Sequence, residues 1–205
     1  MAESKIKFPV SGVELEGRLH KGLSDRGVVI SHPHPLYGGD MNNPVVEAVQ
    51  QAYQDHGHTT LRFNFRGVGA SEGHFDDGKG ETDDVSGALE YLAALGIAKI
   101  DLAGYSFGAW VNARAALTGV GYHKMVMVSP PVAFIDFGDI TSIPALGLVL
   151  TGSADDIAPA EKVREAMPGW NPDAEFIIIE GADHFYWGFH SDLKTVLGRF
   201  LETKS

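Results

Sequence analysis

Short runs of apolar residues alternate along this chain with longer segments of helical periodicity, and this alternation constrains the fold more than any other feature. A strand that is apolar at successive positions must be covered on both faces, as in a parallel sheet between two helical layers. The runs that predict such strands are Gly27–Ser31, Thr59–Phe65, Lys99–Gly104, Lys124–Ser129, Leu146–Thr151 and Glu175–Glu180.

An antiparallel hairpin is predicted before these strands, from Lys5–Val10 and Val13–His20 around a Ser-Gly turn. Five helices are predicted between and after the strands, and in one of them Val85, Leu89 and Leu92 recur at helical spacing. The predicted helices are Pro44–His56, Thr82–Leu95, Phe107–Leu117, Pro159–Ala166 and Ser191–Leu201. We therefore expect an α/β protein with about eight strands, mostly parallel, and helices on both faces.

The length and charge narrow the class of protein. A chain of 205 residues predicts one domain, residues 1–205. Sixteen Lys and Arg against 27 Asp and Glu give a net charge of −11, which repels nucleic-acid backbones and anionic lipids. We therefore expect a small-molecule substrate, with no nucleic-acid or membrane partner, and a monomer or homodimer.

Cysteine usage and the opening segment bear on chemistry and location. The absence of cysteine excludes disulfides, thiolate metal sites and a cysteine nucleophile. Residues Met1–Lys7 lack the apolar core of a signal peptide, and no later segment is apolar enough to span a bilayer. We expect a cytoplasmic protein.

A serine between two glycines lies where one predicted strand passes into a helix. Gly104 and Gly108 flank Ser106 in a G-x-S-x-G pattern, between the strand Lys99–Gly104 and the helix Phe107–Leu117. Such a strained strand-to-helix turn needs flanking residues without side chains and presents the serine hydroxyl at the carboxyl end of the sheet. The helix N-terminus there favours developing negative charge. The pattern predicts that Ser106 is a nucleophile.

A serine nucleophile needs a base that is itself oriented by an acid, and the order to test is Ser, acid, His. Asp155 and Asp156 both follow the strand ending at Thr151; Asp155 is nearer the strand, whereas Asp156 is placed to cap the next helix. The alternative is that both aspartates are caps. His184 follows the last strand, 29 residues beyond Asp155, and His190, at the start of the final helix, is the weaker candidate for the base.

Acyl transfer also needs backbone N–H groups that stabilise the oxyanion. One is expected from Phe107, directly after the serine. The other should come from the loop His32–Gly39, in which proline supplies no N–H, so His34 is the first candidate and Leu36 the second. A metal site at His32 and His34 is disfavoured, because a proline separates them and no third ligand is near.

Several motifs resemble known enzymes. Gly104–Gly108, Asp155–Pro159 and Asp183–Phe185 are similar, in content and order, to the α/β-hydrolase superfamily. His32–Gly39 and Phe63–Gly73 resemble, more narrowly, small uncapped bacterial hydrolases akin to dienelactone hydrolases. The resemblance covers nearly the whole chain and implies the α/β-hydrolase fold.

The same resemblance implies a catalytic triad of Ser106, His184 and Asp155, with the first aspartate of the pair as the acid. It implies no metal or organic cofactor. The nucleophile of dienelactone hydrolases is usually cysteine, whereas this chain has Ser106. This difference moves the expected substrates towards ordinary esters.

The site is expected to be open and apolar. The segment between Ser129 and Leu146 is too short for a lid domain. Tyr37, Phe134 and Trp187 are the predicted substrate-binding residues. The other candidate lining residues are Phe107, Phe137, Phe185 and Tyr186, and we expect about half of these aromatic side chains to face substrate, since most aromatics lie in cores.

Two further segments are predicted to be structural. Ser71–Asp84 is rich in acidic residues and reads as a solvated loop that runs into a helix. Arg66 is interpreted as a packed charge paired with this acidic loop rather than as a substrate contact. Gly73–Gly80 nearly matches a phosphate-binding loop but lacks the hydroxyl that would bind magnesium.

These observations predict a serine hydrolase that cleaves small carboxylic esters through an acyl-enzyme. A thioesterase or acyltransferase would use the same residues with another substrate. The alternative from a different class is a hydrolase-fold module that binds a ligand without turning it over.

Overall fold

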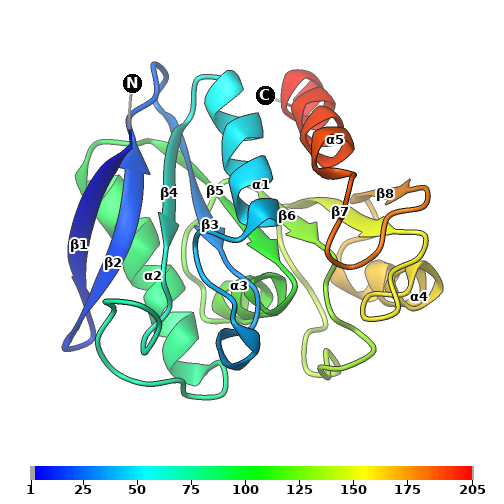
Figure 1. The fold of residues 1–205 in the computed structure, drawn as a ribbon, viewed down its shortest axis with the longest axis horizontal. Coiled ribbons are helices and arrows are strands. Elements are labelled where there is room, and N and C mark those ends of the chain that lie inside the picture. The colour runs from blue at the N-terminus through cyan, green and yellow to red at the C-terminus, as the bar shows by residue number, and fades with distance from the viewer. Residues whose placement is uncertain (1–2, 205) are drawn as a thin grey trace.

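The computed structural model describes residues 3–204; the first two residues of the opening segment and residue 205 lie outside it. One eight-stranded sheet runs through the molecule in the order β1-β2-β4-β3-β5-β6-β7-β8 (Figure 1). β1 and β2 pair antiparallel, as do β2 and β4, and the remaining pairs are parallel. The strands are β1 (Ser4–Val10), β2 (Val13–His20), β3 (Arg26–Ser31), β4 (Thr59–Phe63), β5 (Lys99–Tyr105), β6 (Met125–Val128), β7 (Leu146–Gly152) and β8 (Glu175–Ile179).

Helices cover both faces of the sheet, which confirms the predicted α/β architecture. One buried apolar cluster joins the sheet to α1 and α5, and a second cluster joins its other face to α2, α3 and α4. The helices are α1 (Pro44–Asp55), α2 (Lys79–Ala94), α3 (Phe107–Leu117), α4 (Ala160–Trp170) and α5 (His190–Lys204), with a short 3₁₀ turn η1 (Pro35–Tyr37) after β3.

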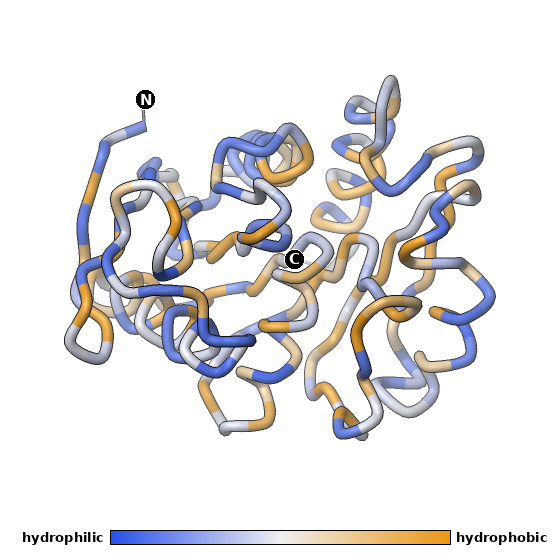
Figure 2. Tube along the Cα trace, turned by 60° about the horizontal axis from the view of Figure 1, so that its bottom comes forward, coloured by the Kyte–Doolittle hydropathy of each residue, from blue (hydrophilic) through white to orange (hydrophobic). Residues whose placement is uncertain are grey.

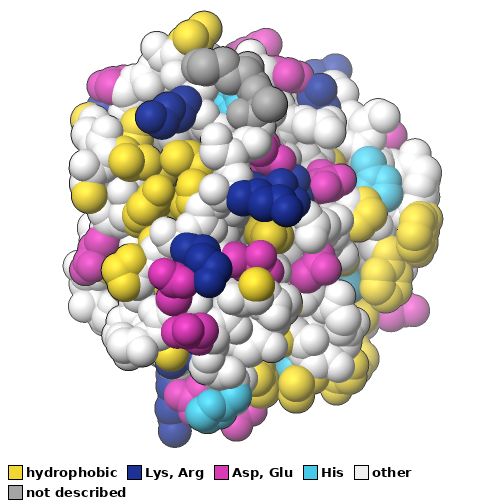
Figure 3. Space-filling view, turned by 60° about the vertical axis from the view of Figure 1, so that its left-hand side comes forward, with side chains coloured by type: hydrophobic (Ala, Val, Ile, Leu, Met, Phe, Trp, Pro, Cys, Tyr) yellow, Lys and Arg dark blue, Asp and Glu magenta, His cyan; other side chains and the backbone are white. Residues whose placement is uncertain are grey.

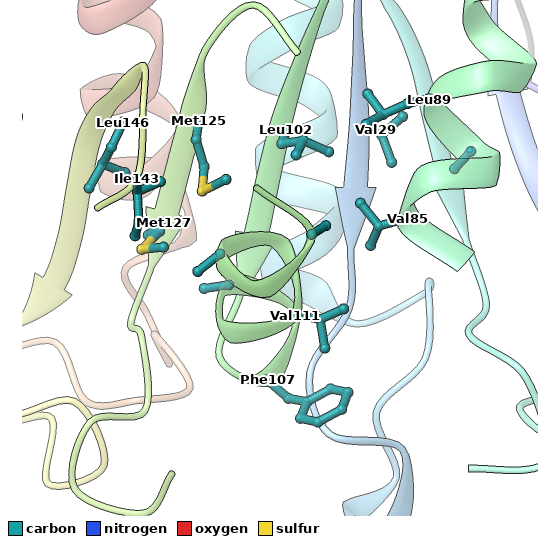
Figure 4. Packing of buried hydrophobic residues seen from close by; sticks show 14 of the residues in the cluster. Val29, Val85, Leu89, Leu102, Phe107, Val111, Met125, Met127, Ile143 and Leu146 are labelled. Atoms are coloured by element: carbon teal, nitrogen blue, oxygen red, sulfur yellow. The ribbon is translucent and has the colours of Figure 1, made fainter. Parts of the chain in front are cut away.

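The central strands are apolar at successive positions because alternate side chains point to opposite faces of the sheet and pack in different apolar clusters. In β3, Val29 packs with α2 and α3, whereas Val28 and Ile30 pack with α1 and α5. Figure 4 shows Val29 beside Val85 and Leu89 of α2. The sheet therefore forms the middle layer of three.

The edge strand β1 has a different pattern. Hydrophilic and hydrophobic segments alternate along it (Figure 2), since only one face of this strand packs on the core. Lys5, Lys7 and Pro9 on this strand discourage pairing with another chain. Lys7 pairs with Glu14 of β2 at 2.7 Å, and Figure 3 shows basic and acidic side chains interspersed on this side of the molecule.

The acidic segment differs from its prediction as a solvated loop. The helix α2 begins at Lys79 rather than Thr82, because the Glu81 carboxylate accepts the Gly78 N–H at 2.8 Å and caps the helix. Glu81 and Asp84 are both fully buried. Asp84 accepts two hydrogen bonds from the guanidinium of Arg66, at 2.8 Å from Nη2 and 3.1 Å from Nε, so Arg66 is indeed a packed structural charge.

Other element ends also differ from prediction. β4 ends at Phe63, two residues early, and α4 continues through Pro168 to Trp170, beyond the predicted end at Ala166. The buried apolar side chains of Met167 and Trp170 stabilise this added turn.

The connection from β6 to β7 contains no helix or strand among the described residues, and this confirms the absence of a lid domain. No helix in the described part of the chain has both the length and the apolar character needed to cross a bilayer.

Candidate active site

Ser106 lies at a strained turn between β5 and α3. Its backbone has φ 54° and ψ −120°, a conformation that residues with side chains rarely adopt. The turn is tight: a Cβ at Gly104 would lie 2.5 Å from the Gly108 carbonyl oxygen, and a Cβ at Gly108 would lie 2.4 Å from the Ser31 carbonyl oxygen. Both flanking positions therefore require glycine, and α3 is held against the end of β3.

Three side chains from three strand ends form a hydrogen-bonded chain. The Ser106 Oγ is 2.9 Å from His184 Nε2, and His184 Nδ1 is 2.9 Å from Asp155 Oδ2 and 3.0 Å from Oδ1. An ionised carboxylate only accepts, so Nδ1 carries the proton and Nε2 accepts from the Ser106 hydroxyl. Ser106, His184 and Asp155 are all buried, with at most 7 % of their surface exposed.

The loop after β7 fixes the carboxylate of Asp155. Its Oδ1 accepts the N–H of Ala158 at 2.7 Å and that of Ile157 at 2.9 Å. Burial alone would raise the pKa of Asp155, but the hydrogen bonds and charge of His184, with the Ala158 N–H, hold this pKa below its ordinary value. Asp155 therefore both caps its own loop and contacts the histidine, whereas Asp156 is exposed.

The loop after β8 fixes His184. Asp183 Oδ1 accepts the Phe185 N–H at 3.0 Å, and the Tyr105 hydroxyl donates to the His184 carbonyl at 2.8 Å. Tyr105 belongs to the G-x-S-x-G segment, so this bond joins the serine turn to the histidine loop. His190 is the first residue of α5 and packs against Trp187, outside the hydrogen-bonded chain.

The backbone N–H of Phe107, directly after Ser106, and that of His34 have no acceptor among the residues that the structure describes. The two residues are neighbours, with ring centroids 4.7 Å apart. The N–H of Leu36 is instead donated to His34 Nδ1 at 3.2 Å. Of the two loop candidates, His34 is thus the one with a free donor.

His32 holds the start of this loop. Its Nδ1 donates to the Pro33 carbonyl at 2.6 Å, and its Nε2 accepts the Phe65 N–H at 3.1 Å. Burial lowers the pKa of His32 to about 4, so the ring is neutral at pH 7. Because both ring nitrogens are occupied, the structure does not support a metal site at His32 and His34.

The aromatic residues divide into exposed and buried groups. Tyr37, Phe134, Phe185 and Trp187 are exposed on loops at the carboxyl edge of the sheet. Of the other three candidates, Phe137 packs against Trp170, and the rings of Phe107 and Tyr186 are buried in the apolar clusters. Sequence reasoning also missed Phe75, whose ring lies 5.1 Å from His34.

One cavity lies near the carboxyl edge of the sheet, and another lies on a helical face of the molecule. One of about 410 Å³ is bounded by residues 35–40 of the loop after β3 and residues 66–75 of the loop after β4. The larger one, about 820 Å³, is a polar groove between α1 and α5 and contains none of the three hydrogen-bonded residues. Ser106, Asp155 and His184 do not line either cavity.

A mostly parallel sheet with helices on both faces, and a strained serine turn after its central strand, define an α/β hydrolase. No protein-family model matches the chain. It is 38% identical, over 184 residues, to the uncharacterized protein RP471 of Rickettsia prowazekii, covering 84% of this chain and 77% of that protein.

Two solved structures are similar over nearly their whole length. An α/β serine hydrolase homologue from Coxiella burnetii is 33% identical, with a TM-score of 0.89 and 97% of each chain covered. XC6422 from Xanthomonas campestris, an α/β serine hydrolase without a lid, is 29% identical, with a TM-score of 0.91 and coverage of 99% of this chain and 95% of that one. The chain belongs to the α/β serine hydrolase family.

Proposed function

We propose that this hydrolase is a serine esterase that cleaves small carboxylic esters through an acyl-enzyme. The observation that carries the proposal is the unbroken hydrogen-bonded chain from Asp155 through His184 to Ser106. In this arrangement a base is within reach of the nucleophile, and an acid orients the base.

In the proposed reaction His184 Nε2 takes the hydroxyl proton as Ser106 Oγ attacks the ester carbonyl carbon. The imidazolium then gives this proton to the departing alkoxide, and the alcohol leaves an acyl group on Ser106. Water attacks the acyl carbon in the same way, with His184 again as base, and releases the carboxylic acid. Asp155 holds the Nδ1–H tautomer and stabilises the imidazolium in both halves. Only protein groups and water take part.

The free N–H groups of Phe107 and His34 are the proposed oxyanion hole. Phe107 directly follows Ser106, the His34 ring packs against the Phe107 ring, and neither N–H has another acceptor among the described residues, which supports this role. Removing one such donor typically lowers kcat about 10²- to 10³-fold. The N-terminus of α3 adds a favourable dipole at the same place.

The exposed rings of Tyr37, Phe134 and Trp187 are the proposed substrate contacts. They supply apolar surface at an open edge, which suits small uncharged esters. The net charge of −11 disfavours substrates that carry several phosphates.

The test is a stopped-flow assay with p-nitrophenyl esters of short acids and matched thioesters. We expect a burst of about one nitrophenolate per protein, followed by slower turnover, and faster hydrolysis of esters than of thioesters. Binding without a burst would favour the ligand-binding module, and faster cleavage of thioesters would favour a thioesterase.

A matched pair of variants tests the assignment of the acid. Asp155→Asn should lower kcat by about 10³- to 10⁴-fold, because the amide cannot hold the required tautomer. Asp156→Asn, one residue along and exposed, should retain activity. Equal losses in the two variants would contradict the assignment.

A further inference from the structure

The tyrosine that directly precedes Ser106 contacts the loop that carries His184. Tyr105 is the last residue of β5, and its ring is buried in the apolar cluster that joins the sheet to α1 and α5. Its hydroxyl is 2.8 Å from the His184 carbonyl oxygen. A carbonyl oxygen only accepts, so the phenol is the donor. The Tyr105 ring also packs beside the His184 imidazole, with ring centroids 5.4 Å apart.

The backbone of His184 has little other support. Among the residues that the structure describes, the Tyr105 hydroxyl is the only donor to the His184 carbonyl, and the His184 N–H has no acceptor. The nearby Ala182 is instead held by the loop after β7, because its carbonyl accepts the Ala154 N–H at 2.9 Å. The hydrogen bonding of the His184 backbone therefore depends on one side chain from the serine turn.

The nucleophile and its base are thereby joined twice. Ser106 Oγ is 2.9 Å from His184 Nε2, and the adjacent Tyr105 holds the His184 carbonyl. These two hydrogen bonds close a ring through the Tyr105 side chain, the Ser106 main chain and His184. The Asp155 carboxylate orients the imidazole, whereas Tyr105 fixes the backbone from which the imidazole extends.

The phenol stays a donor while the charge of His184 changes. Burial, followed by the charges of Asp155 and Asp183, raises the pKa of Tyr105 well above its ordinary value near 10. Tyr105 is therefore protonated whether His184 is an imidazole or an imidazolium. The bond to the His184 carbonyl is available in both states.

We propose that Tyr105 is a positioning residue for the reaction, and that its hydroxyl holds the backbone of His184 where the imidazole reaches the Ser106 hydroxyl. This inference rests on the proposed function. Tyr105 takes no proton itself and acts through His184. The G-x-S-x-G pattern leaves the residue before the serine open, and here that residue links the serine turn to the histidine loop.

The first test deletes one oxygen atom. Tyr105→Phe should lower kcat about 5- to 100-fold, because misplacing a catalytic group by about 1 Å can cost about 10²-fold. His184 is the base in both acylation and deacylation, so both steps should slow together and leave KM within about twofold of wild type.

Tyr122→Phe is the matched control for this deletion. Its hydroxyl also donates to a backbone carbonyl, that of Pro144, in the segment before β7. Both variants should lose some thermal stability, since each leaves a carbonyl without its donor. Only Tyr105→Phe should lose kcat, and Tyr122→Phe should keep the wild-type value.

A second test asks whether Tyr105 acts through the histidine. Phosphonylation of Ser106 by a fluorophosphonate should slow in Tyr105→Phe by about the same factor as kcat. In a His184→Ala background, Tyr105→Phe should cause no further slowing, because the residue that it positions is absent. Tyr105→4-aminophenylalanine keeps a donor on a ring of the same shape and should retain kcat within about threefold of wild type.

Four results would overturn the proposal. They are wild-type kcat in Tyr105→Phe, a change confined to KM, equal losses of kcat in Tyr105→Phe and Tyr122→Phe, and additional slowing by Tyr105→Phe in the His184→Ala background.

A measurement on wild type covers the case in which Tyr105→Phe does not fold. The Tyr105 hydroxyl proton, followed by NMR in protein with ¹³C-labelled tyrosine, should exchange slowly with water before and after phosphonylation of Ser106. Rapid exchange in either state would overturn the inference, because the hydrogen bond would not be maintained.

A further measurement separates this inference from the proposed function. If wild type neither hydrolyses esters nor reacts at Ser106, the proposed function fails on its own. The ¹H resonance of the His184 Nδ1–H still tests the positioning: it should shift in Tyr105→Phe and stay in place in Tyr122→Phe. An unshifted resonance in Tyr105→Phe would overturn the inference.

Discussion

The backbone of Ser106 is strained, and its hydroxyl is hydrogen-bonded to His184. Its φ of 54° and ψ of −120° cost about 1–3 kcal/mol for a residue with a side chain. The N–H of Ser106 donates to the Val128 carbonyl at 2.9 Å, which fixes the turn against β6. The strain is maintained because it brings Oγ within 2.9 Å of His184 Nε2.

Replacing Ser106 with glycine should therefore stabilise the fold while abolishing hydrolysis. Ser106→Gly relieves the positive φ, and we expect a gain of about 1 kcal/mol, or about 2–4 °C in Tm for a chain of this size. Thermal unfolding followed by circular dichroism measures the shift, with Ser106→Ala as the control that removes the hydroxyl but keeps the strain. A lower Tm for Ser106→Gly than for Ser106→Ala would contradict the strain account.

His32 gives the stability a defined pH dependence. Its pKa is near 6.5 in an unfolded chain and about 4 in the fold, because burial disfavours the imidazolium. Between these values the unfolded state binds more protons, so stability is fully present above about pH 6.5 and falls as the pH is lowered towards 4. This difference in pKa corresponds to a change of about 3 kcal/mol in the free energy of unfolding.

Urea unfolding of wild type and His32→Gln across this pH range measures the effect. We expect the free energy of unfolding of wild type to fall more steeply with decreasing pH than that of His32→Gln. The free energy of unfolding of His32→Gln should still fall with decreasing pH, since burial also lowers the pKa values of His34 and His58. Identical slopes would show that His32 titrates normally in the fold.

At the scale of elements, the packing of α3 against β3 positions the serine. A Cβ at Gly108 would come within 2.4 Å of the Ser31 carbonyl oxygen and 2.7 Å of the His32 carbonyl oxygen, both backbone atoms. Gly108→Ala should push α3 away from β3, lower Tm and reduce kcat. Gly121→Ala is the matched control, because no atom lies within 4 Å of its added Cβ and its φ is not positive. Equal effects of the two substitutions would contradict this account.

The strands could be predicted from the sequence because burial on both faces leaves a strong local signal. Consecutive apolar residues identify β3 and β6, and the G-x-S-x-G glycines identify the turn between β5 and α3. The start of α2 could not be predicted, since it depends on a buried carboxylate, Glu81, in a segment that reads as solvated. A pairing of Arg66 with the acidic segment was predicted, but Asp84 was not identified as the partner.

The residues of the candidate site also divide into those that could be predicted from the sequence and those that could not. Ser106, Asp155 and His184 could be placed together because parallel strands bring their carboxyl ends to one edge. The contact between Tyr105 and His184 could not, since it depends on how the loop after β8 folds against the serine turn. A tyrosine at the open position of the G-x-S-x-G pattern carries no local signal of that contact.

At the scale of the whole molecule, the charge of −11 should select among substrates. We expect a higher kcat/KM for a neutral ester than for an ester of equal size that carries a carboxylate. Raising the ionic strength from about 0.01 M to about 1 M shortens the Debye length from about 30 Å to about 3 Å and should narrow this difference. A preference that does not change with salt would mean that local contacts, rather than net charge, discriminate.

We propose that Ser106 is an activated nucleophile, and intact-mass analysis after treatment with a fluorophosphonate tests this assignment. We expect one adduct on wild type and none on Ser106→Ala. The adduct should form much more slowly on His184→Ala, because the base is missing. A folded wild-type protein without an adduct, or an adduct that persists in Ser106→Ala, would contradict the claim.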